Sequence, residues 1–75
     1  MTLDEFVSAF AAEFDETPED QFNADTEFKS LEEWSSLTAL SIIAMIDEQM
    51  DKTVTGADIR ASKTIEDLFN LANSK

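Results

Sequence analysis

The sequence predicts an all-α fold, a small four-helix bundle of three main helices and one short helix, with a long loop between the first and second. Two observations lead to this prediction. Apolar residues recur at three- and four-residue steps in three segments, which is the period of an amphipathic helix. No segment alternates apolar and polar residues as a half-buried strand does. No linker or internal repeat divides the chain, so residues 1–75 are expected to form one domain.

The first helix is expected from about Leu3 to Phe14. Thr2 and Glu5 form the sequence of a capping box, in which a hydroxyl and a carboxylate each accept a hydrogen bond from a free backbone N–H. The apolar residues of this segment share one face of the helix: Leu3, Phe6, Val7, Phe10 and Phe14.

A long polar connection follows over residues 15–34, and Pro18 prevents the first helix from continuing into it. Loops of this length without secondary structure are uncommon in a small domain unless they are functional or held in place. The connection contains four apolar residues without a helical period, which are expected to anchor it to the bundle: Phe22, Phe28, Leu31 and Trp34.

The second helix is expected from about Ser36 to Gln49, with Ser35 as its N-cap. On a helical wheel its core-facing stripe consists of Ala39, Ile42, Ile43, Ile46 and Met50. A separate arc holds more apolar residues than folding needs, together with polar ones: Leu37, Leu40 and Ala44 beside Ser36, Ser41 and Glu48. Exposed apolar residues beside a hydroxyl at a helix N-terminus favour a docking surface around a reactive or modified serine.

Two further helices complete the expected bundle. A short one is predicted at the sequence GADIR, with Thr55 as N-cap and Asp58 three residues later. The last one covers IEDLFNLAN and is capped by Thr64, with Asp67 near its positive N-terminal end. Its expected buried residues are Ile65, Leu68, Phe69 and Ala72.

The composition excludes several classes of function. Seventeen acidic residues against five basic ones give a net charge of −12, which repels nucleic acids and anionic membranes and favours partners with basic patches. The chain has no Cys and no His, which removes thiol nucleophiles, imidazole bases, zinc sites and disulfides. No EF-hand calcium loop is present, and the only glycine is Gly56. A DNA-mimicking acidic protein is compatible with the composition but has no supporting motif.

The sequence has neither a signal peptide nor an apolar run near the ~20 residues of a membrane span. A cytoplasmic protein without membrane insertion is therefore expected. Because the chain starts with Met and has no second domain, a free-standing monomer is expected rather than a part of a larger synthase.

Three roles are open for Ser36: a nucleophile, a modification site or a helix starter. A catalytic serine needs a base, and neither Lys52 nor Lys63 lies in a motif that would supply one. A phosphate ester suits the position, because a helix N-terminus stabilises phosphate through free N–H groups. Physical reasoning alone favours the helix starter, since serines are common there.

The segment WSSLTAL resembles the attachment region of acyl carrier proteins, whose signature is Asp-Ser-Leu at the start of the second helix of a small acidic bundle. Leu37 sets the register, so Ser36 matches the modified serine. The resemblance covers the whole chain, including the long loop, the run IIAMIDEQM, the short helix near GADIR and KTIEDL at the start of the last helix.

This resemblance implies a carrier, not an enzyme, in which Ser36 bears a covalent 4′-phosphopantetheine whose thiol holds acyl groups as thioesters. The implied partners are a phosphopantetheinyl transferase and acyl-processing enzymes with basic docking patches, in fatty-acid, polyketide or related biosynthesis. The expected docking residues are Leu37, Leu40, Ser41, Ala44, Glu48 and Glu33.

The sequence departs from the family pattern at Ser35, which stands where these carriers usually have Asp. Serine keeps the helix cap but removes a carboxylate beside the attachment site. The second helix also carries Thr38 and Ser41 where such carriers are often acidic. The residues at Thr38 and Ser41, on the exposed side of the helix, bear on the identity of the partner enzymes and are compatible with a carrier for a specialised pathway as well as with the housekeeping fatty-acid carrier. The departure at Ser35 supports an alternative, a carrier-like helical module that is never modified and acts only through protein contacts.

Overall fold

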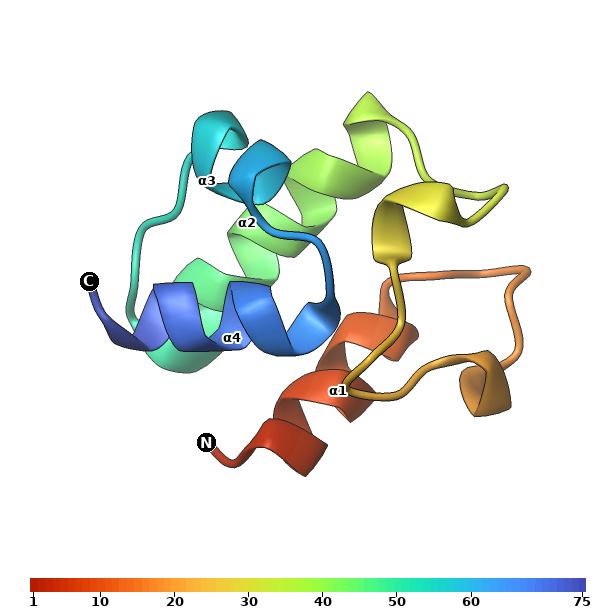
Figure 1. Cartoon of the computed structure of the whole chain (residues 1–75), viewed down its shortest axis with the longest axis horizontal. Coiled ribbons are helices and arrows are strands. Elements are labelled where there is room, and N and C mark those ends of the chain that lie inside the picture. The colour runs from red at the N-terminus through yellow and green to blue at the C-terminus, as the bar shows by residue number, and fades with distance from the viewer.

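Four α-helices and two 3-10 turns make up the structure, a computed structural model that describes all residues from Met1 to Lys75. The α-helices are α1 (Leu3–Ala12), α2 (Ser36–Met50), α3 (Gly56–Ala61) and α4 (Ile65–Asn73), and the 3-10 turns are η1 (Glu19–Gln21) and η2 (Phe28–Ser30). Helices α1 and α4 pack together, α2 contacts α1 and α3, and α3 contacts α4 (Figure 1). The predicted all-α bundle, with its short third helix and long first loop, is confirmed.

All four predicted N-caps are present, because each is a local interaction within four residues. Ser35 caps α2, and three threonines begin the other helices with complete capping boxes: Thr2 with Glu5, Thr55 with Asp58, and Thr64 with Asp67. In the first box the Thr2 N–H donates to the Glu5 carboxylate at 2.7 Å. Each box satisfies backbone donors that the helix itself leaves unpaired.

Helix α1 ends two residues earlier than predicted. Its last turn tightens, with the Glu13 N–H donating to the Phe10 carbonyl at 3.1 Å and the Phe14 N–H donating to that of Ala11 at 3.0 Å. Phe14 therefore lies beyond the helix but is still buried. The apolar period shows correctly which residues enter the core, but it does not show where the backbone stops being helical.

The long loop is held to the bundle by its apolar residues, as predicted. Phe22 and Phe28 are buried, and the half-buried Leu31 and Trp34 pack against the core. The Phe22 ring lies 4.9 Å from that of Phe14, and the Trp34 ring lies 5.0 Å from that of Phe28, between centroids. The two 3-10 turns within the loop were not predicted from the sequence.

The loop also makes backbone hydrogen bonds to α4. The Ile65 N–H donates to the Thr26 carbonyl at 3.1 Å, and the Glu66 N–H donates to the Ala24 carbonyl at 3.0 Å. These are first-turn donors of α4, which have no partner inside their own helix. The loop thus completes the start of the last helix.

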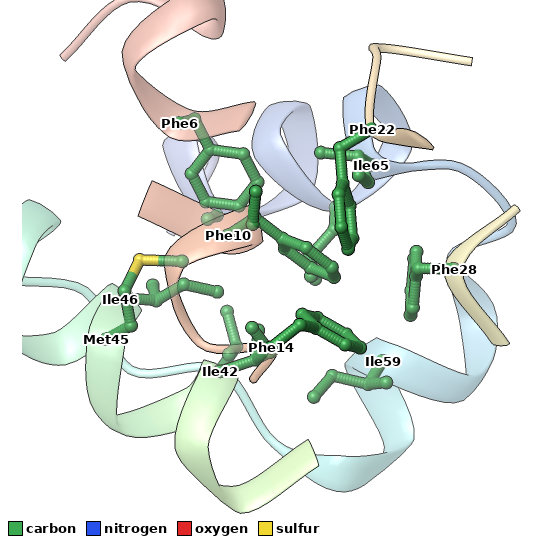
Figure 2. Close-up of a cluster of buried hydrophobic side chains, with 14 residues drawn as sticks. Phe6, Phe10, Phe14, Phe22, Phe28, Ile42, Met45, Ile46, Ile59 and Ile65 are labelled. Atoms are coloured by element: carbon green, nitrogen blue, oxygen red, sulfur yellow. The ribbon is translucent and has the colours of Figure 1, made fainter. Parts of the chain in front are cut away.

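The core is a single cluster of buried side chains from all four α-helices and the loop (Figure 2). From α2 the buried residues are Ile42, Met45 and Ile46, whereas Ala39, Ile43 and Met50 are only half-buried. The sequence prediction therefore placed the stripe slightly off the true buried face and missed Met45. The reason is that α2 packs against both α1 and α3, so the centre of its buried face depends on where these two helices lie.

Helix α4 contributes Ile65, Leu68 and Ala72 to this cluster as predicted, while Phe69 is half-buried, with its ring 5.2 Å from that of Phe6. None of the helices combines the length and the apolar composition that crossing a membrane requires.

Replacing Phe28 with Ala is expected to cost about 3–5 kcal/mol of unfolding free energy, because it removes a fully buried aromatic ring from the contact between loop and bundle. Leu37→Ala is the control, since the Leu37 side chain is 76% exposed. Its cost should stay within about 0.5 kcal/mol. Urea denaturation of both variants measures the difference, and similar small losses would show that the loop is not part of the core.

Candidate functional site

The first turn of α2 is closed by a small network of hydroxyl groups. The Ser35 Oγ accepts a hydrogen bond from the Thr38 N–H at 3.3 Å, which makes Ser35 the N-cap. The Ser35 and Thr38 hydroxyls lie 3.2 Å apart, and the Thr38 Oγ1 also donates to the Glu33 carbonyl at 3.0 Å. Thr38, expected on the exposed side of the helix, is therefore half-buried and bonded inside the chain.

Ser35 and Ser36 are both exposed, but they differ in their hydrogen bonds. Ser36 is the first residue of α2, and its hydroxyl takes no part in the hydrogen bonds of this turn. Because Ser35 does the capping, the start of the helix gives no reason for a serine at position 36. The role of helix starter, which physical reasoning favoured for Ser36, is therefore filled by Ser35, the predicted N-cap.

The backbone around Ser36 suits a phosphate ester. The Thr38 N–H is occupied by Ser35, and the Ala39 N–H makes the first bond to the Ser35 carbonyl. The N–H groups of Ser36 and Leu37 have no partner within the helix, as is usual in a first turn. Such donors, together with the positive end of the helix dipole, favour an anion bound to the adjacent hydroxyl.

The chain has no His, and Lys52 is not placed to act as a base for Ser36. Lys52 follows the opposite end of α2, about 20 Å away for a helix of this length, and donates to the carbonyl of Lys75. No group of three or more acidic side chains is close enough together to hold a metal ion. The geometry suits a serine that accepts a group from another protein.

The predicted docking residues of α2 lie along the helix from Leu37, next to Ser36, to Glu48 near the opposite end. Leu37 is 76% exposed and Leu40 62% exposed, the highest values among the large apolar side chains. Ala44 and Glu48 are also exposed, and Ser41 is half-buried. No charged residue occurs between Glu33 and Asp47, so this part of the helix is uncharged in an otherwise acidic protein.

The two hollows of the surface lie elsewhere. The larger, of about 600 Å³, opens over the long loop and is lined mainly by polar residues such as Glu16, Thr17 and Glu32. The smaller lies beside α1, next to Ala11 and Phe14. Neither is lined by Ser36 or by the exposed leucines, so the candidate site is an open surface that suits contact with a protein better than enclosure of a small ligand.

Glu33 has a role that the sequence did not reveal. Its carboxylate accepts hydrogen bonds from the N–H groups of Asp15, Glu16 and Thr17 at 2.8, 3.1 and 2.8 Å, and from the Thr17 hydroxyl at 2.7 Å. The Thr17 hydroxyl and these three N–H groups hold the pKa of Glu33 below its usual range. The side chain is thus engaged within the chain, and docking through Glu33 stays a prediction. No local pattern points to this contact, because the partners are 16 to 18 residues away.

A small acidic helical bundle with an exposed serine at the start of its second helix is the arrangement that the resemblance to carrier proteins implies. A family model described as "Phosphopantetheine attachment site" matches residues 5–71 of the chain. The protein belongs to this family, that of the acyl carrier proteins, whose members attach 4′-phosphopantetheine covalently to a serine and are not themselves catalytic. Comparisons with curated proteins and with solved structures gave no match.

The engaged carboxylate of Glu33 makes a pH-dependent contribution to stability. Because folding lowers the pKa of Glu33, its contribution is fully present above the ordinary value of 4.5 and is lost as the pH falls through the lower folded value. Glu33→Gln should therefore melt at a lower temperature than the parent chain at pH 7, and this difference should shrink below pH 4.5.

Glu32→Gln is the matched control, because it removes the same charge from an exposed neighbour. Its melting temperature should follow that of the parent chain through the acid range. If the curves of Glu33→Gln and the parent stay parallel below pH 4.5, the carboxylate does not hold the loop.

Proposed function

We propose that Ser36 is the serine that carries 4′-phosphopantetheine in this protein. The observation that supports it is that the two serines differ in their hydrogen bonds. The Ser35 Oγ caps the helix, whereas the exposed Ser36 has an unpaired hydroxyl. When bound, the group supplies a thiol that holds acyl chains as thioesters, which agrees with a chain that has no Cys of its own. Ser36 provides the oxygen of the phosphate ester, and the free N–H groups of the first turn stabilise its charge.

The partners of such a carrier are a phosphopantetheinyl transferase and enzymes that process the acyl group. We propose that they contact α2 through Leu37, Leu40 and Ala44, which are exposed beside Ser36. Ser41 lies at the edge of this surface, and the exposed Glu48 lies further along the helix. The net charge of −12 favours partners whose surrounding surface is basic.

The cellular role proposed with this site is that of a monomeric carrier, a single domain over residues 1–75, in the cytoplasm. It would present fatty-acid, polyketide or related acyl intermediates to biosynthetic enzymes. The family assignment supports the carrier role, and the sequence resemblance supports the pathway class.

A second function is favoured by one observation, the serine at position 35. An unmodified module that acts only through protein contacts would keep the cap that Ser35 provides and would have no use for the carboxylate that carriers usually have there. Intact mass after incubation with coenzyme A and a phosphopantetheinyl transferase separates the two functions.

In this experiment the parent chain should gain the mass of one 4′-phosphopantetheine group, and Ser36→Ala should gain none. Ser35→Ala should still be modified, because the hydroxyl of Ser35 serves only as a cap, although losing that cap costs roughly 1 kcal/mol of stability. Modification of Ser36→Ala would place the group on another residue, and an unmodified parent chain would favour the second function.

Leu40→Ala should leave the fold nearly intact and weaken the contact with the transferase. Because the Leu40 side chain is 62% exposed, the loss of unfolding free energy should be about 0.5 kcal/mol, far below the 2–5 kcal/mol of a buried apolar residue. The kcat/KM for modification should fall about fivefold or more, since an apolar anchor near an interface centre can dominate affinity.

Ile42→Ala is the contrasting variant, because Ile42 is fully buried and two residues away on the same helix. It should lose stability strongly and, at a temperature where it is folded, keep its modification kinetics. A large stability loss for Leu40→Ala with unchanged kinetics would assign Leu40 to the core.

A further inference from the structure

The segment that leads into α2 is attached to the start of the long loop, just after α1, by the side chain of Glu33. The carboxylate receives four hydrogen bonds from residues 15–17, the stretch that immediately follows Phe14. Three consecutive N–H groups converge on it, which is a geometry that binds an anion and not a neutral amide. A charge-assisted contact of this kind is stronger than an ordinary hydrogen bond.

The next residue attaches the same segment through its ring. Trp34 stacks on Phe10 and Phe14 of the α1 side, with centroid distances of 6.5 and 6.4 Å and interplanar angles of 3° and 23°. Its edge-on contact with Phe28 adds a connection to the loop. Glu33 is therefore attached to residues 15–17, which follow α1, and Trp34 is attached to Phe10 in α1 and to Phe14 just beyond it.

The backbone of Glu33 is connected in turn to the first turn of α2. Its carbonyl accepts the hydrogen bond from the Thr38 hydroxyl at 3.0 Å, and the same hydroxyl lies 3.2 Å from that of Ser35. Ser36 thus lies between two attached points, residue 33 before it and residue 38 after it. Its own side chain touches none of these groups and stays free.

We propose that Glu33 is a positioning residue for Ser36: by binding residues 15–17 through its carboxylate and Thr38 through its carbonyl, it holds the exposed serine in one orientation for the modifying transferase. This inference rests on the proposed modification of Ser36. It goes beyond that function because it assigns Glu33, three positions before Ser36, an influence on the rate of modification. The carboxylate of Glu33 acts through hydrogen bonds within the chain.

The test compares Glu33→Gln with Glu32→Gln, which lose the same charge from adjacent residues. Glu32 is exposed and accepts none of these hydrogen bonds. At a temperature where circular dichroism shows both variants to be folded, Glu33→Gln should lose about tenfold in kcat/KM for modification, because small misplacement of a reacting group has effects of this size. Glu32→Gln should stay close to the parent.

A second measurement does not depend on modification at all. The ¹⁵N order parameter of the Ser36 amide should fall in Glu33→Gln from the value of about 0.85 that is typical of rigid backbone, and should stay unchanged in Glu32→Gln. If Glu33→Gln does not fold, Thr17→Val replaces it, since that change removes a single hydrogen bond to the carboxylate. In Thr17→Val the order parameter of the Ser36 amide and the kcat/KM for modification should then both fall, by less than in Glu33→Gln.

Equal slowing in both Gln variants would overturn the proposal, because it would mean that the charge attracts the transferase directly. Parent-like kinetics and order in folded Glu33→Gln would overturn it as well, leaving the contact a purely structural one. A parent chain that gains no mass would refute the proposed function, and the order parameter of Ser36 would then decide the positioning role on its own.

Discussion

The packing of the long loop on α1 through Phe10 is the contact on which the rest of this structure depends. The Phe10 ring is fully buried and has five aromatic neighbours within 6.5 Å between centroids: Phe6, Phe14, Phe22, Phe28 and Trp34. Three of these come from the loop. A chain of 75 residues without disulfides buries little apolar surface through its helices alone, so the loop must contribute side chains to the core. The loop is therefore a structural element, although it contains only two 3-10 turns.

The second constraint is the net charge of −12, which opposes a compact state through self-repulsion. The structure uses several carboxylates as hydrogen-bond acceptors for the backbone. Glu5, Asp58 and Asp67 accept from the caps of their own helices, and Glu33 accepts from the loop. Basic residues contribute little to this, since the one ion pair joins Asp58 to Lys75. Backbone N–H groups thus stabilise these four carboxylates, of which only Asp58 is also paired with a cation.

The candidate site benefits from both constraints. The aromatic packing places Trp34, two residues before the first residue of α2, against Phe10 of α1. No charged residue occurs in the sequence between Glu33 and Asp47. The first three turns of α2 are therefore uncharged, and exposed leucines lie there beside Ser36. The exposed Ser36 hydroxyl beside these leucines agrees with the carrier role of the family.

The sequence by itself determined the fold class, the four helix starts and the identity of the aromatic anchors. Caps such as Thr64 with Asp67 act over three residues, and the apolar period of a helix is equally local, so both can be recognised without knowing any distant neighbour. The sequence also predicts Ser36 as the modified serine from its position before Leu37, and this stays a prediction. It shows as well the surplus of apolar residues on α2. The exposure of Leu37 and Leu40 agrees with that interpretation.

Only the tertiary structure decided where α1 ends, that Met45 belongs to the buried face of α2, and that Glu33 binds the chain and not the solvent. Each of these depends on an element remote in sequence: the loop that turns back after Ala12, the position of α1 and α3 around α2, and the N–H groups of residues 15–17. It also shows that the Ser36 hydroxyl takes no part in the hydrogen bonds of the first turn of α2, whereas Ser35 provides the cap that the sequence predicts. The direction of the backbone at the entry to α2 places the Ser35 hydroxyl over the Thr38 N–H and leaves that of Ser36 exposed to solvent.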